Sequence, residues 1–91
     1  MKISIISPCS ASYIIQHGIK SWPIKQFDAK TFYWKYDEKE VCLILEGEAT
    51  LITQTNIIYN VSAGDFVKFP KNFACTWTIH KFLRKHYRIG D

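Results

Sequence analysis

The feature that most constrains this chain is a succession of short apolar or alternating runs, each closed after a few residues by a turn signal. No segment carries a convincing helical period. Runs spaced in this way are typical of an antiparallel sandwich or barrel. Aromatic residues make up 15% of the chain and favour the same class, because aromatic and β-branched side chains suit strands. The expected strands are Ile19–Ile24, Thr31–Tyr36, Val41–Leu45, Ala49–Thr53, Ile57–Val61, Phe66–Phe69, Cys75–Ile79 and Phe82–Ile89.

The breaks between these runs are rich in Gly, Asp, Asn and Pro, which are the usual turn residues. They are expected at Asp28-Ala29, Asp37–Lys39, Gly47, Gln54–Asn56, Ser62–Asp65 and Pro70–Asn72. A chain of 91 residues forms one domain, 1–91, with the barrel expected over 19–89. Residues 1–18 are the least patterned and are expected to add an N-terminal arm or an edge strand. A short helix near Ser10–Gln16 is the alternative.

Parity assigns a face to each side chain, because alternate residues of a strand point to opposite sides of the sheet. The sets that share a face are Phe32, Trp34 and Tyr36; Glu40, Cys42 and Ile44; Cys75, Trp77 and Ile79; and Leu83, Lys85, Tyr87 and Ile89. Lys85 is therefore the one charge on an otherwise apolar face. The three histidines, His17, His80 and His86, show no shared spacing that suits a metal and are expected at the surface.

The charge distribution and the cysteine content of the chain indicate which binding partners and which cellular compartment to expect. The net charge is +4, with an acidic segment at 37–48 and a basic segment at 68–91. The basic charges split between two faces of a strand, so we do not expect a nucleic-acid partner. Three widely spaced cysteines, Cys9, Cys42 and Cys75, form no CxxC pair, which favours a reducing, cytoplasmic setting. No segment approaches the length of a membrane span.

Two segments together resemble the paired motifs of the cupin superfamily. The first, Glu40–Glu48, is a Glu that leads into a strand and turns at Gly; the second, Gly64–Pro70, is a Gly-Asp turn that leads through a strand to Pro. Trp22-Pro23 and the basic run Arg84–Arg88 add a likeness to the small single-domain cupins of the ethanolamine-utilisation and ureidoglycine aminohydrolase types. The resemblance implies an all-β, small antiparallel cupin barrel (an RmlC-like jelly roll), dimeric through its edge strands.

The departures from the cupin pattern bear on the site. The resemblance implies a His-x-His before the motif Glu and a third His in the second motif, which together hold a divalent metal. Here these positions read Trp34-Lys35-Tyr36 and Cys75, so that only Glu40 remains of the usual ligand set. We therefore expect no cofactor. A weakly bound divalent metal on Glu40 and Cys75 stays an alternative, although two ligands make a poor site. Asn72 stands where the family usually has Gly, a small departure because Asn tolerates positive φ.

Parity and the resemblance together predict a pocket mouth in place of a metal centre. Its expected lining is Trp34, Tyr36, Glu40, Cys75, Trp77 and Lys85. A buried Glu40 needs a partner, and Lys85 is the expected counter-cation, with Tyr36 donating a hydrogen bond.

Three functions stay open at this point. One is a metal-free pocket that binds a small polar metabolite, nitrogenous or carboxylated. The second is an enzyme of hydrolase or isomerase type in which Glu40 is the general acid or base and Tyr36 assists. The third is a structural or interaction module whose barrel is filled by its own side chains, including Trp34 and Trp77.

Overall fold

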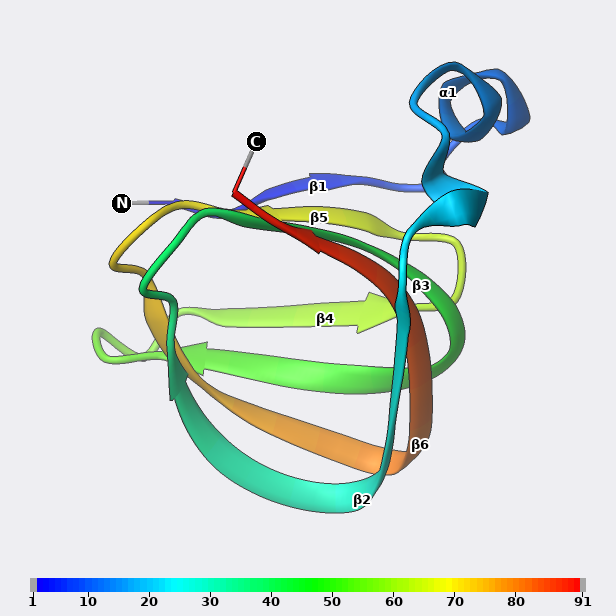
Figure 1. Ribbon diagram of the computed structural model, residues 1–91. Coiled ribbons are helices and arrows are strands. Elements are labelled where there is room, and N and C mark those ends of the chain that lie inside the picture. The colour runs from blue at the N-terminus through cyan, green and yellow to red at the C-terminus, as the bar shows by residue number, and fades with distance from the viewer. Residues whose placement is uncertain (1, 91) are drawn as a thin grey trace.

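The structure is a computed structural model, and it describes residues 2–90. This part of the chain forms six strands, one short helix and one 3₁₀ turn. Their arrangement is drawn in Figure 1. In chain order they are β1 Ser4–Ile6, α1 Ala11–Gln16, η1 Ile19–Ser21, β2 Ile24–Lys35, β3 Glu40–Thr53, β4 Ile58–Ser62, β5 Phe66–Phe69 and β6 Ala74–Ile89. No helix within residues 2–90 has the length and apolar character needed to cross a membrane.

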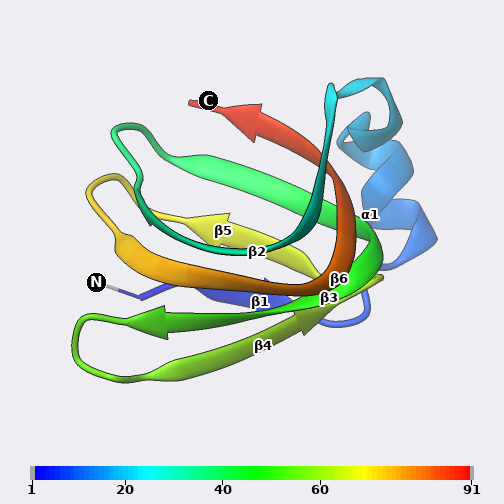
Figure 2. The same cartoon turned by 90° about the horizontal axis from the view of Figure 1, so that it is seen from below.

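All the strand pairs in this part of the chain are antiparallel, in one sheet of order β1-β5-β3-β6-β2 with β4 paired to β3. The long strand β3 pairs with β6 along most of its length. On its other edge, its first residues pair with β5 and its last residues with β4. The sheet curls round on itself (Figures 1 and 2). The all-β antiparallel barrel predicted from the sequence is confirmed.

The break expected at Gly47 does not end a strand. Gly47 lies inside β3, which joins the two runs predicted at Val41–Leu45 and Ala49–Thr53, and β6 likewise joins the two runs predicted after residue 74. The β3–β6 register shifts on both sides of Gly47, whose φ is +87°. A β-bulge bends a strand without ending its pairing. A glycine at this point therefore marks a bend that closes the barrel, and not a turn.

The region before β2 also differs from the prediction. The strand expected at Ile19–Ile24 is wrong: η1 follows Gly18, whose left-handed φ of +61° turns the chain, and only Ile24 belongs to a strand. Pro23 has no N–H to donate to a sheet ladder, so β2 begins after it. The turn expected at Asp28-Ala29 is wrong too. β2 continues through it with a register shift between Asp28 and Lys30.

Two local predictions from the sequence are confirmed, the short helix before β2 and the positive φ of Asn72. The short helix considered near Ser10–Gln16 is α1, and the Ser10 hydroxyl accepts a hydrogen bond from the Tyr13 N–H at 3.1 Å, as an N-cap does. Asn72 has φ +72°, the conformation in which it can replace glycine. Its N–H donates to the Tyr36 carbonyl and the Tyr36 N–H donates to the Phe73 carbonyl, so this turn holds Tyr36 in place beyond the end of β2.

The apolar side chains form two clusters on opposite sides of the sheet. The larger one lies inside the barrel and includes Cys75, Trp77 and Ile79, the set that parity placed there. The smaller one, Ile19, Leu43 and Phe66, lies outside, and side chains of the N-terminal segment pack against it. Residues 9–22 thus cover part of the outer face, whereas β1 pairs with the edge of β5 and Ile5 packs against the inner cluster.

Candidate functional site

A cavity of about 360 Å³ lies inside the barrel against the inner face of β2. Six of its ten lining residues come from β2, two from β6, one from the first position of β3, and Tyr36 from the link between β2 and β3. They are Lys25, Phe27, Lys30, Phe32, Tyr33, Trp34, Tyr36, Glu40, Trp77 and Lys85. Most of the lining is aromatic, and the rest is charged. This combination is common in small-molecule sites, where apolar walls exclude water and a few polar groups set the orientation.

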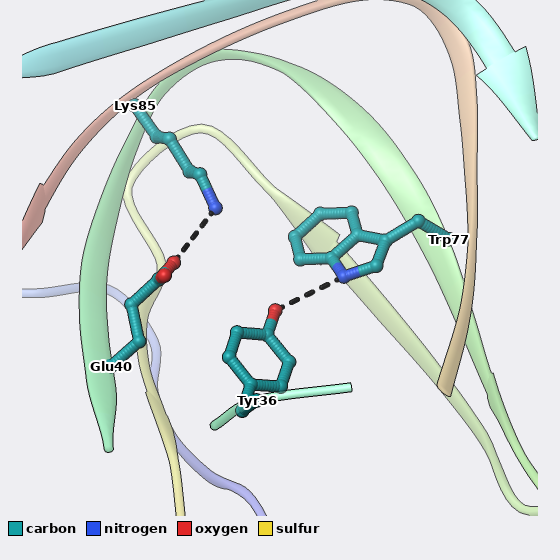
Figure 3. A network of polar contacts seen from close by, with 4 residues as sticks. All are labelled: Tyr36, Glu40, Trp77 and Lys85. Atoms are coloured by element: carbon teal, nitrogen blue, oxygen red, sulfur yellow. Dashed lines mark hydrogen bonds and ion pairs between the residues drawn. The ribbon is translucent and has the colours of Figure 1, made fainter. Parts of the chain in front are cut away.

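The charged centre of the cavity is the ion pair between Glu40 and Lys85 (Figure 3). Lys85 Nζ lies 3.2 Å from Glu40 Oε2. The two residues are 5% and 7% exposed, so both charges are largely removed from water. A buried ion needs a partner of opposite charge, because its desolvation is otherwise too costly. The counter-cation expected for Glu40 is present.

Tyr36 makes a different hydrogen bond from the one expected. Its hydroxyl accepts from Trp77 Nε1 at 3.1 Å, and no Tyr36–Glu40 hydrogen bond is present (Figure 3). The Tyr36 ring stacks on Phe69 at 4.4 Å between centroids. Burial, and then the negative charge of Glu40, raise the pKa of Tyr36 well above its usual range. The side chain is therefore a neutral phenol whose own proton can still be donated.

The two tryptophans of the predicted lining both border the cavity, at different depths. Trp77 is 2% exposed and belongs to the barrel core, with its ring parallel to Phe32 at an interplanar angle of 3°. Trp34 is 49% exposed, so it lies toward solvent. Trp77 thus packs in the barrel core and also lines the cavity, whereas the exposed part of Trp34 can contact a bound ligand.

Cys75 was expected in the lining, but it is not among the residues that border the cavity. It is 1% exposed within the barrel core, where it pairs across the sheet with Trp34. Burial raises the pKa of the Cys75 thiol to about 11, and it does the same for Cys42. Both thiols are therefore neutral near pH 7 and poor nucleophiles. Parity gave the face of Cys75 correctly but could not give its depth.

The donors in this cavity do not fit the divalent metal that the cupin pattern implies. Within residues 2–90, no group of three or more His, Cys, Asp or Glu side chains could hold a metal ion. Glu40 already has the Lys85 ammonium beside it, and a second cation there would be repelled. His17 and His80 are exposed. His86, expected at the surface, is 7% exposed beneath the N-terminal segment, with Nδ1 2.9 Å from the Trp22 carbonyl oxygen.

The sequence prediction missed five residues at the cavity: Lys25, Phe27, Lys30, Phe32 and Tyr33. The register shift between Asp28 and Lys30 reverses the parity of β2, so that Lys25 and Phe27 before it face the same side as Lys30 after it. Because a turn was expected at Asp28-Ala29, parity was not carried across it, and the shared face of these residues was not recognised. The signal that could have found them is the alternation of lysine and aromatic residues on both sides of Asp28-Ala29.

A curled antiparallel sheet with Glu40 at the start of β3 is the arrangement that the resemblance to the cupins predicted. The chain belongs to the family of the EutQ-like cupin domain, whose model matches residues 15–87.

Solved structures agree with this assignment. A DUF861-family protein of Thermotoga maritima is 32% identical, covers 97% of this chain and 99% of its own, and superposes with a TM-score of 0.92. The EutQ protein of Clostridium difficile is similar in fold, with 18% identity and a TM-score of 0.67. That match covers 74% of this chain but only 52% of the EutQ chain. A cupin superfamily protein of Desulfitobacterium hafniense shares the fold at 12% identity, with a TM-score of 0.59 over 99% of this chain and 79% of its own. No protein of curated function matches the sequence.

Proposed function

We propose that this chain is a metal-independent cupin that binds a small polar metabolite in the cavity of its barrel. The observation that carries this proposal is the buried Glu40–Lys85 ion pair, which borders a cavity of about 360 Å³. A barrel filled only by its own side chains would leave no such space beside a charged pair. The aromatic rings supply contact area, and the ion pair with the neutral Tyr36 hydroxyl supplies the polar anchors.

Trp34→Ala is the variant that tests this proposal with least risk to the fold, because half of the Trp34 side chain is already exposed. We expect the loss of one aromatic wall to weaken binding by about tenfold. The measurement is titration calorimetry with ligands found in a library of small acids, amines, amides and sugars. Ile58→Ala is the matched control, since Ile58 is exposed on β4 and does not line the cavity. If no library member binds the wild-type protein saturably, or if the two variants behave alike, the proposal fails.

The second candidate function is catalysis with Glu40 as general acid or base. It is favoured by one observation, a 7%-exposed carboxylate at the cavity surface close to a phenol that can donate a proton. Positioned proton transfer contributes about 10²–10⁴-fold to a rate. Glu40→Gln should therefore lower turnover of a bound amide or sugar at least a hundredfold and leave its affinity within a few-fold. Binding without turnover in the wild-type protein would count against this candidate and leave the binding proposal intact.

Two further expectations from the sequence stay proposals. The three cysteines are unpaired, which suits a reducing compartment such as the cytoplasm. In the described part of the chain, β2 has a sheet partner only in β6, so that its other edge is available to pair in a homodimer.

A further inference from the structure

The lining of the cavity carries more positive than negative charge. Three ammonium groups border it, those of Lys25, Lys30 and Lys85, and the remaining lining residues include a single carboxylate, Glu40. In the described part of the chain Glu40 pairs with Lys85, and no acidic side chain pairs with Lys25 or Lys30. Two cations therefore border the same small volume without a counter-ion from the protein.

Lys25 and Lys85 are also directly opposite each other. They are register partners on β2 and β6, and both side chains border the cavity. Like charges at directly opposed positions destabilise a strand pair. Glu40 offsets one of the two charges only. Lys25 is exposed, so water screens part of this repulsion, and a bound anion would be attracted by both ammonium groups.

Aromatic rings compensate these cations only in part. Lys25 Nζ lies 4.5 Å from the centroid of the Tyr87 ring, and Lys30 Nζ lies 4.9 Å from those of both Phe27 and Phe32. Such contacts orient an ammonium group but stabilise it much less than a carboxylate does. Lys25 and Lys30 are both exposed, so the rings favour positions of the head groups beside the cavity and do not hold them rigidly.

We infer that the ligand of this cavity is an organic acid. Its carboxylate lies between Lys25 and Lys85, and its planar or apolar body lies along Phe27, Phe32 and Trp77. This inference rests on the proposed function and narrows its ligand to one charge class. An aromatic cavity alone would suit an ammonium ligand equally well, as in aromatic cages that bind methylated amines. The three lysines exclude that class, because a cationic ligand would meet them at close range.

The test uses three probes of nearly the same shape and different charge: benzoate, benzamide and benzylammonium. Binding to the full chain is measured by titration calorimetry at low ionic strength. We expect benzoate to bind at least about ten times more tightly than benzamide, since a charge-assisted hydrogen bond is about twice as strong as a neutral one. Benzylammonium should bind more weakly than benzamide.

Lys25→Met should lower benzoate affinity about tenfold and change benzamide affinity less than twofold. It should leave the fold unchanged or more stable, because it removes the like-charge pair. Lys81→Met is the matched control: it changes the net charge equally, and Lys81 is exposed on β6 outside the cavity. If benzamide or benzylammonium binds as well as benzoate, or if both lysine variants act alike, the inference is overturned and the proposed function stands. If no carboxylic acid binds, the inference also falls. The library of acids, amines, amides and sugars then decides the proposed function by itself.

Discussion

Lys85→Met is expected to lower the free energy of unfolding by about 3–5 kcal/mol, because it leaves the Glu40 carboxylate buried without its cation. The methionine side chain fills nearly the same volume, so the loss of packing is small. In a domain of this size, 1 kcal/mol corresponds to about 4–8 °C in the melting temperature. The variant should therefore melt at least about 12 °C below the wild-type protein in a calorimetric scan.

The double variant Lys85→Met/Glu40→Gln separates the ion pair from the packing. Removing both charges leaves no unpaired ion, so most of the lost stability should return, with a coupling energy of at least about 2 kcal/mol. Glu46→Gln provides the comparison, since the Arg84–Glu46 pair has side chains 39% and 51% exposed. An exposed pair contributes about 1 kcal/mol or less. A loss below 1 kcal/mol for Lys85→Met would mean that water reaches the pair.

Gly47→Ala is expected to prevent the barrel from closing, with a loss of at least about 4 kcal/mol. An added methyl carbon would lie 1.7 Å from the Phe82 carbonyl oxygen and 2.8 Å from its carbonyl carbon. These are backbone atoms of the paired strand β6, so no side-chain rotation relieves the clash. The φ of +87° adds strain for any residue with a Cβ. Urea unfolding followed by circular dichroism should show a protein that is unfolded or barely folded at 25 °C.

Gly18→Ala isolates the contribution of the backbone conformation. Gly18 also has a left-handed φ, +61°, but the nearest atom to an added Cβ is the flexible Ser21 hydroxyl at 3.8 Å. The expected loss is only about 1–2 kcal/mol, the ordinary cost of that conformation in a residue with a side chain. Equal losses for the two alanine variants would show that the close approach of β3 and β6 at Gly47 is not maintained in solution.

The sequence predicted the fold class well and the strand boundaries less well, for one physical reason. Turn residues such as Pro70–Asn72 do reverse the chain, but Gly47 and Asp28-Ala29 only shift the register of strands that continue through them. A turn that reverses the chain and a bulge that shifts the register both favour glycine or small polar residues within a few positions. Local sequence therefore does not distinguish a turn from a bulge. The distinction depends on whether a partner strand lies alongside, which is a property of the whole sheet.

The residues of the candidate site could be predicted where the alternation of side chains along a single regular strand decides which face they occupy. Glu40 was identified from its place in the cupin motif, and Lys85 because it is a charge on an apolar face and a buried carboxylate needs a partner. Lys25 and Lys30 were missed because a register shift separates them, and Cys75 was expected at the cavity because parity gives direction and not depth. His86 points outward as expected, but residues 9–22 cover that face, and no pattern within β6 could show this.

Native mass spectrometry tests the central claim most directly, namely that this cupin binds a small metabolite without a metal. Untagged protein is purified without chelator, incubated with a metabolite extract and transferred to a volatile buffer, and the same is done with Lys25→Met and Lys81→Met. The account predicts one small organic acid per chain and no transition metal, with the adduct lost in Lys25→Met and kept in Lys81→Met. A stoichiometric transition metal, or a wild-type chain that retains no molecule from the extract, would contradict it.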